Sequence, residues 1–175
     1  MIQILRAVFE VGENSVCLIE TSEPYIQVYD CYDCIPIGKR SYIKTRQEEP
    51  VHFTLRNPQA MKLCFIALDN CLLDERDTPR CDFVIGNLQK MYFVEIKNTI
   101  VNQRRAARKS AIVQLDASIE YFKNNIDLTN TILIAVTSLK GKQALPLQNA
   151  TRAAEIVKFR DRHNASLMEG DTAVF

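Results

Sequence analysis

Three charged side chains lie where apolar residues would be expected in the clearest predicted hairpin of the chain. The hairpin joins two apolar runs, 81–85 and 91–96, through a short turn that begins with glycine. Asp82 lies at the start of the first run, and Glu95 and Lys97 lie near the end of the second. Because side chains alternate faces along a strand, Glu95 and Lys97 share one face. We therefore expect Asp82 to be a cross-strand neighbour of Glu95 and Lys97.

These residue types indicate metal-assisted phosphodiester hydrolysis. Two converging carboxylates repel one another unless a cation lies between them, and a hard ion such as Mg²⁺ prefers oxygen ligands. Such an ion generates hydroxide near neutral pH, and the ammonium group of Lys97 can steer the water or stabilise the transition state. The sequence has no paired Ser/His or Cys/His signature and no glycine-rich phosphate loop, which disfavours acyl and hydride transfer. The alternative is a cross-strand salt-bridge cluster on a solvated sheet face.

Helix and strand patterns alternate around this hairpin. Asn57 and Pro58 predict the start of a helix that continues to about Leu73, because apolar residues then recur at helical spacing. After the hairpin, the patterns predict a helix over 102–125, a buried strand over 131–137, a helix over 149–162 and a partly extended tail over 164–175. This order argues for an α/β (α+β) core in which helices flank a mixed sheet.

The N-terminal third of the chain has a different character. Up to Gly38 it carries one basic side chain and six acidic ones. We expect residues 1–56 to form a β-rich appendage beside a core of residues 57–175, and to recognise substrate, build a dimer or engage a partner protein. Turn residues separate the predicted strands of this meander, which cover 2–11, 15–20, 25–29 and 41–45.

The segment Pro79-Arg80-Cys81-Asp82, followed after a 12-residue interval by Glu95-Ile96-Lys97, a long helix and a buried strand, resembles the PD-(D/E)XK nuclease superfamily. The resemblance covers about residues 57–140. It implies the restriction-endonuclease-like fold, which Holliday-junction resolvases share, and a Mg²⁺-dependent DNA endonuclease in which Mn²⁺ can replace Mg²⁺. By this resemblance Asp82, Glu95 and the main-chain carbonyl of Ile96 bind the metal. Lys97 then assists the attacking water.

The resemblance implies two further site residues. Family members often add a carboxylate from the helix before the motif, so Asp69 is the first candidate for an additional metal ligand, with Asp74 and Glu75 behind it. Many members also place a glutamine on the helix after the lysine strand. Gln114 matches that place and is expected to be catalytic.

Four basic side chains crowd the first turns of the helix predicted over 102–125. The chain as a whole has a formal charge of only +1, so binding of nucleic acid must come from local charge. Cations at a helix N-terminus oppose the helix dipole, and we expect them there to hold a phosphate backbone. The expected partner is DNA, with RNA less favoured, and a homodimer is favoured because nucleases that cut two strands are commonly dimers. These residues are Arg104, Arg105, Arg108 and Lys109.

A different class of function remains open: a nuclease-like fold that no longer cuts and serves as a nucleic-acid-binding or protein-assembly module. If the protein is a nuclease, Asp82→Ala and Lys97→Ala should each abolish cleavage without disrupting the fold. A binding module would be indifferent to both substitutions.

The remaining signals concern cysteines, histidines and the membrane. The six cysteines are expected to be reduced and half-buried, and Cys31 and Cys34 have metal or redox spacing without a second pair to complete a site. His52 and His163 are expected at the surface. No apolar run reaches the roughly 18 residues of a spanning helix, and no signal-peptide pattern is present, so we expect a cytoplasmic protein without a membrane contact.

Overall fold

The computed structural model describes residues 1–31, 40–73, 79–140 and 150–175. Its helices are α1 (Ile2–Val8), α2 (Arg104–Asn125), which follows the single 3-10 turn η1 (Val101–Gln103), and α3 (Ala150–His163). Its strands are β1 (Leu18–Thr21), β2 (Tyr25–Cys31), β3 (Arg40–Ile43), β4 (Phe53–Arg56), β5 (Leu63–Ala67), β6 (Phe83–Gly86), β7 (Lys90–Asn98), β8 (Ile132–Lys140), β9 (Ala165–Glu169) and β10 (Thr172–Val174).

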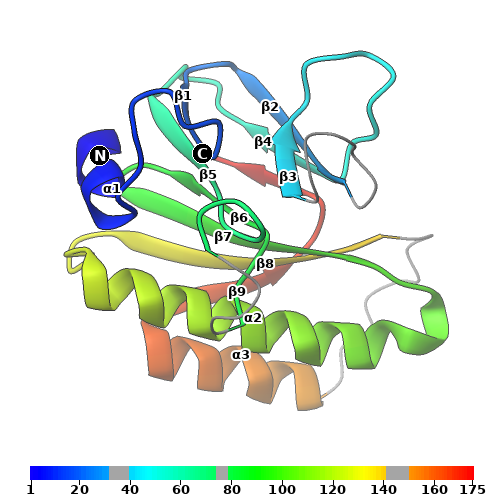
Figure 1. Cartoon of the computed structure of the whole chain (residues 1–175). Coiled ribbons are helices and arrows are strands. Elements are labelled where there is room, and N and C mark those ends of the chain that lie inside the picture. The colour runs from blue at the N-terminus through cyan, green and yellow to red at the C-terminus, as the bar shows by residue number, and fades with distance from the viewer. Residues whose placement is uncertain (32–39, 74–78, 141–149) are drawn as a thin grey trace.

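The strands form two sheets, and the helices cover the larger one on a single face. The larger sheet has six strands in the order β1-β5-β6-β7-β8-β9, and the smaller has four in the order β10-β4-β2-β3. Helices α2 and α3 lie below the six-stranded sheet in Figure 1, and strands β2, β3 and β4 lie above it. Strands β7, β8 and β9 run parallel, as expected when helices supply the crossovers. The fold is therefore mixed α/β, as predicted, but its second covering layer is a sheet.

Apolar packing on both faces holds the β6–β7 hairpin in place. Every residue of β5 and β6 is buried. On the helix side, the ring of Phe93 lies 5.1 Å from that of Phe122 on α2, measured between centroids. On the other side, the ring of Phe83 lies 5.7 Å from that of Phe53 on β4. Each such side chain stabilises the fold by about 1.5–3 kcal/mol through burial. The polar residues near the start of β6 and the end of β7 are therefore attached to a well-packed apolar core.

Most of the predicted elements are confirmed. Strands β6 and β7 form the predicted hairpin, and α2, β8 and α3 occupy the predicted ranges to within a few residues. Strands β9 and β10 account for the partly extended tail, and β1, β2 and β3 confirm three of the strands predicted in residues 1–56.

The helix predicted over 57–73 is wrong, because this segment contains a turn followed by β5. The side chain of Asn57 closes the turn instead of capping a helix: its Oδ1 accepts a hydrogen bond from the Met61 N–H at 3.0 Å, and its Nδ2 donates to the Met61 carbonyl at 2.9 Å. The apolar residues that follow pair with β1 on one side and β6 on the other. A strand buried on both faces is nearly continuous in apolar residues and so also matches helical spacing.

The strand predicted over 2–11 is also wrong, because residues 2–8 form helix α1. Ile2, Leu5 and Phe9 lie three and four positions apart, which places them on one face of a helix. Leu5 is fully buried in the same apolar cluster as Phe122 of α2, and Ile2 and Phe9 pack against that cluster.

Two strand pairs cross the expected boundary between residues 56 and 57. Strand β1 pairs with β5, and β4 pairs in parallel with the C-terminal strand β10. Residues 1–56 therefore share both sheets with the rest of the chain. Among the helices that the structure describes, none combines the length and the apolarity that a membrane crossing requires.

The expectation of reduced cysteines is wrong for three residues. Cys17 and Cys71 form a disulfide with Cα atoms 5.6 Å apart, and Cys31 is also disulfide-bonded. The antiparallel pairing of β1 with β5 brings the residue before β1 next to the loop after β5, which is a contact that local sequence does not reveal. Cys64 and Cys81 are free, as expected, but are fully rather than half buried, and Cys34 lies outside the described residues.

Candidate active site beside strands β6 and β7

The predicted pair of carboxylates meets where β6 begins and β7 continues beyond it. Phe83 is the first residue of β6 and pairs with Val94, so Asp82 lies opposite Glu95. The Asp82 N–H donates to Glu95 Oε2 at 3.0 Å, and the Ile96 N–H donates to Asp82 Oδ2 at 2.5 Å. Each carboxylate therefore accepts a backbone hydrogen bond from the opposite strand. This exchange fixes the two acids relative to each other.

Lys97 and the backbone of Ile96 complete this arrangement. Lys97 Nζ lies 2.6 Å from Glu95 Oε1, and a quarter of the lysine side chain is exposed. The side chain of Ile96 packs in the core between the two sheets, whereas its N–H bonds Asp82 beyond the start of β6. In a strand the N–H and C=O of one residue point to the same side. The Ile96 carbonyl is thus directed toward the two acids, as the predicted main-chain ligand requires.

Burial makes both acids difficult to ionise. Glu95 is 1% exposed and Asp82 is 8% exposed. Burial raises the pKa of Glu95 to about 7, against the opposing effect of Lys97. Burial, followed by the charges of Glu95 and Asp30, raises the pKa of Asp82 well above its ordinary range. A divalent cation between the two groups would favour their charged forms, so the acids fit a metal that prefers oxygen ligands.

A cavity of about 230 Å³ opens beside these acids. All six residues that were expected to bind metal or take part in catalysis line it, together with four that were not expected. The expected residues are Asp69, Asp82, Glu95, Ile96, Lys97 and Gln114, and the others are Asp30, Cys31, Arg40 and Asn70.

Gln114 reaches the cavity from α2 and supports the segment that precedes Asp82. Its Nε2 donates to the carbonyl of Arg80 at 2.9 Å. One turn further along the helix, the hydroxyl of Ser118 accepts a hydrogen bond from the Cys81 N–H at 2.7 Å. Two successive residues before Asp82 are therefore held by α2, which couples the position of the carboxylate to the helix.

Asp69 lines the cavity from a loop rather than from the predicted helix. The N–H groups of Leu68 and Asp69 donate to the carbonyl of Asp82 at 3.0 and 3.4 Å, which holds the loop beside the carboxylate pair. The oxygens of Asp69 are both engaged, because Oδ1 lies 3.4 Å from Arg80 Nε and Oδ2 accepts from Asn70 Nδ2 at 3.0 Å. Asp74 and Glu75 lie outside the described residues.

Asp30 and Arg40 were not expected at this cavity, because the predicted core excluded residues 1–56. Asp30 follows Ile26 and Val28 at the inward positions of β2 and is itself buried. An acidic residue that continues an inward apolar series was the available signal, although its neighbours depend on how the two sheets pack. Arg40 donates through Nη1 to the sulfur atoms of Cys17 and Cys71, so it lies against the disulfide at the edge of the cavity.

The basic residues at the start of α2 differ in their exposure and in their partners. Arg108 is engaged with Glu169 of β9, with Nε 3.1 Å from Oε2. Because successive residues of a helix are 100° apart, Arg105 lies toward the same side as Arg108, whereas Gln114 faces the cavity. Arg105 and Lys109 are exposed, and Arg104 is half-buried. Contact of these four residues with nucleic acid stays a prediction.

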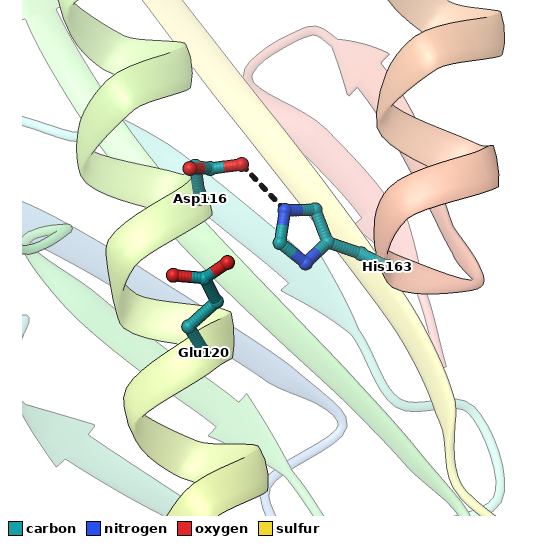
Figure 2. A group of neighbouring side chains, drawn as sticks. All are labelled: Asp116, Glu120 and His163. Carbon is teal, nitrogen blue, oxygen red and sulfur yellow. Dashed lines mark hydrogen bonds and ion pairs between the residues drawn. The ribbon is translucent and has the colours of Figure 1, made fainter.

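A second group of possible metal ligands lies between α2 and α3. Figure 2 shows Asp116 and Glu120 on α2 pointing toward His163 at the end of α3, and their ligand atoms lie within 4.8 Å of one another. Arg162 occupies this position, with Nη1 2.8 Å from Asp116 and Nη2 2.5 Å from Glu120. His163 is 1% exposed and lies 2.5 Å from Asp116 Oδ1, so its expected surface position is wrong. The cluster ties the two helices together.

The donor set of the cavity fits Mg²⁺ better than a softer ion. Asp82 and Glu95 offer oxygen atoms, and the Ile96 carbonyl adds a third oxygen of the kind that Mg²⁺ prefers. Among the described residues around the cavity, no three side-chain ligand atoms from different residues lie within 4.8 Å of one another. Two carboxylates and a backbone oxygen therefore leave room for water and phosphate oxygens, which Mg²⁺ usually keeps in its coordination shell.

The chain has no match among protein-family models, among curated proteins or among solved structures.

Proposed function

We propose that the protein is a Mg²⁺-dependent endonuclease that hydrolyses DNA phosphodiester bonds on a restriction-endonuclease-like fold. The proposal rests on one observation, the convergence of Asp82, Glu95 and Lys97 with the backbone of Ile96 at a cavity. A salt-bridge cluster on a solvated face would keep its carboxylates exposed. Here both acids are buried, at a cost in free energy that proteins commonly accept at functional sites.

In this proposal some residues bind the metal and Lys97 contacts the water and the phosphate. Asp82, Glu95 and the carbonyl of Ile96 hold Mg²⁺, or Mn²⁺ in its place. When bound, the ion neutralises phosphate oxygens and favours hydroxide near neutral pH. The ammonium group of Lys97, which is partly exposed to the cavity, donates hydrogen bonds to the attacking water and to the phosphate.

Attack by water in line with the O3′ leaving group breaks the phosphorus–O3′ bond and leaves a 3′-hydroxyl and a 5′-phosphate. Asp69 and Gln114 position the site. Gln114 holds the backbone before Asp82, and Asp69 pairs with Arg80 beside the cavity.

DNA is the proposed substrate, and the exposed Arg105 and Lys109 are proposed to hold its backbone together with Arg104. Arg108 contributes less, because Glu169 already neutralises it. A homodimer is proposed for cutting two strands, and RNA is the less favoured substrate.

Cleavage of defined DNA substrates tests the proposal. Wild type and Lys97→Ala are incubated with supercoiled, linear, single-stranded and branched DNA, in Mg²⁺, in Mn²⁺ or in EDTA, and the products are resolved on a gel. Lys62→Ala is the matched control, because Lys62 is exposed and pairs with Glu20. We expect metal-dependent cutting by wild type and by Lys62→Ala, and loss of cutting in Lys97→Ala. Equal cutting by Lys97→Ala would refute the assigned role of the lysine.

The second candidate is a nuclease-like module that binds nucleic acid or a protein partner without cutting. The ion pair between Lys97 and Glu95 favours it, because the pair compensates the buried acid without a metal. Folded wild type that leaves every substrate intact with either metal would favour this module and direct attention to partners of residues 1–56.

A further inference from the structure

A strip of aromatic and basic side chains runs along the outer face of β2 and β3. Tyr29 and Tyr42 lie opposite each other in the ladder, and their rings stack with centroids 5.4 Å apart and planes 23° apart. The guanidinium carbon of Arg40 lies 4.5 Å from the centroid of the Tyr42 ring. We refer to Arg40, Tyr42 and Tyr29 as the aromatic strip.

The aromatic strip faces away from the core between the two sheets. Along β2, Ile26 and Val28 are buried in that core, and Tyr29 lies between inward positions with its side chain half-buried. The hydroxyl of Tyr29 donates to Glu49 Oε1 at 3.1 Å, which fixes the orientation of the ring. The rings are therefore pre-oriented without being enclosed by the core, and little conformational freedom remains to be lost on binding.

Arg40 belongs both to the aromatic strip and to the candidate active site. It lines the same cavity as Asp82 and Lys97, and its guanidinium group also lies over Tyr42. A chain molecule in contact with the two tyrosines would therefore pass Arg40 before it reaches Lys97. Lys44, the first residue after β3 and two positions after Tyr42, adds a second positive charge near the end of the strip.

We propose that the aromatic strip binds the bases of a single-stranded polynucleotide and directs its backbone into the cavity. The inference rests on the proposed function, because it takes the cavity as the place where a phosphate is cut. Bases within a duplex are stacked on each other and offer no ring face, whereas bases of a single strand can stack on tyrosine. Arg40 and Lys44 would compensate the phosphates. The favoured substrate is thus a single strand or a single-stranded branch of DNA.

Fluorescence anisotropy of labelled oligonucleotides measures this binding separately from cleavage. The full chain is titrated in EDTA into an oligothymidylate of about 16 nucleotides, an oligouridylate of the same length and a duplex of that length. Variants Tyr29→Leu and Tyr42→Leu remove the rings, and Tyr42→Phe keeps the ring without the hydroxyl. The matched control is Tyr25→Leu. Tyr25 is also on β2 and is 64% exposed, but it lies at the first residue of the strand, whereas Cys31 at the last residue lines the cavity.

We expect wild type to bind the single strand more tightly than the duplex. Each leucine variant should weaken single-strand binding at least about fivefold, which corresponds to the lower end of base–aromatic stacking, about 1 kcal/mol. Tyr42→Phe and Tyr25→Leu should bind as wild type does. Tighter binding of the uridylate than of the thymidylate, with the same losses in the variants, would support the strip and identify RNA as the source of the bases.

Leucine variants that fold and bind as tightly as wild type would overturn the inference, as would wild type that prefers the duplex. Circular dichroism and thermal unfolding establish that each variant is folded. Single-strand binding that depends on the tyrosines, in a wild type that cuts nothing, would support the aromatic strip and refute the nuclease proposal. Metal-dependent cleavage of the single strand that is unchanged in both leucine variants would support the nuclease proposal and refute the aromatic strip.

Discussion

Substitution of Glu95 by glutamine should stabilise the protein at alkaline pH in the absence of metal. Burial raises the pKa of this carboxyl from 4.5 to about 7, so the folded state holds the proton between these pH values after the unfolded chain has lost it. The stability from this group is full below about pH 4.5 and falls as the pH rises to about 7. The difference between the two pKa values corresponds to about 3 kcal/mol at 1.36 kcal/mol per pKa unit.

Glutamine resembles the protonated carboxyl in shape and in its capacity to accept a hydrogen bond from the Asp82 N–H. Urea unfolding in EDTA should therefore show wild type and Glu95→Gln to be similar near pH 4, and the variant to be more stable by about 2–3 kcal/mol near pH 8. The exposed Glu23 supplies the control Glu23→Gln, which should follow wild type at every pH.

Addition of Mg²⁺ near pH 8 should cancel this difference in stability between Glu95→Gln and wild type. An ion that binds the folded state at about 100 times its dissociation constant stabilises it by about 2.7 kcal/mol, and Glu95→Gln lacks the carboxylate that the ion needs. The reasoning is refuted if the difference in unfolding free energy between wild type and Glu95→Gln stays constant from about pH 4 to about pH 8. It is equally refuted if Mg²⁺ raises the stability of both proteins to the same extent.

Three further perturbations test how the surroundings support the site. Asp30→Asn should slow single-turnover cleavage about 10-fold or more while preserving the fold, because the buried Asp30 lines the cavity; an unchanged rate would remove it from the site. Gln114→Ala should lower kcat more than it raises KM, because it frees the backbone before Asp82; a change in KM alone would contradict that role. Replacing both Cys17 and Cys71 by serine opens a loop of 54 residues and should cost about 4 kcal/mol of stability; reductant should then lower the melting temperature of the variant less than that of wild type, because only the disulfide of Cys31 remains to be reduced, and an equal loss in both proteins would contradict this.

The site was predictable because its residues break a strong local pattern. Glu95 and Lys97 interrupt a buried strand at alternate positions, and a hairpin turn fixes which residue of the other strand lies opposite. Both signals are local, so the sequence is sufficient to place Asp82 opposite Glu95. Gln114 was expected from the family resemblance alone, and in the structure α2 packs against β7 and brings the glutamine to the cavity.

Long-range pairing explains what could not be predicted. The apolar residues of 63–68 satisfy a helix and a buried strand equally, and only their position between β1 and β6 decides for the strand. Asp30 shares the cavity because the four-stranded sheet packs on the other face of the β6–β7 hairpin. The parallel pairing of β4 with β10 depends on the last residues of the chain, so no pattern within residues 1–56 contains it.

Under the proposed function, the packing of the two sheets would give the N-terminal segment a part in the chemistry. The edge contact between Phe53 of β4 and Phe83 of β6 lies in the apolar layer between the sheets, and Asp82 immediately precedes Phe83. Displacement of one sheet relative to the other would therefore move Arg40 relative to Lys97, although no residue of the cavity itself had changed. Arg40 and Lys97 line the same cavity. In the proposed mechanism, the substrate would bind along the four-stranded sheet and be cut beside the six-stranded sheet. The apolar layer between the sheets would then set the distance between the binding residue Arg40 and the catalytic residue Lys97.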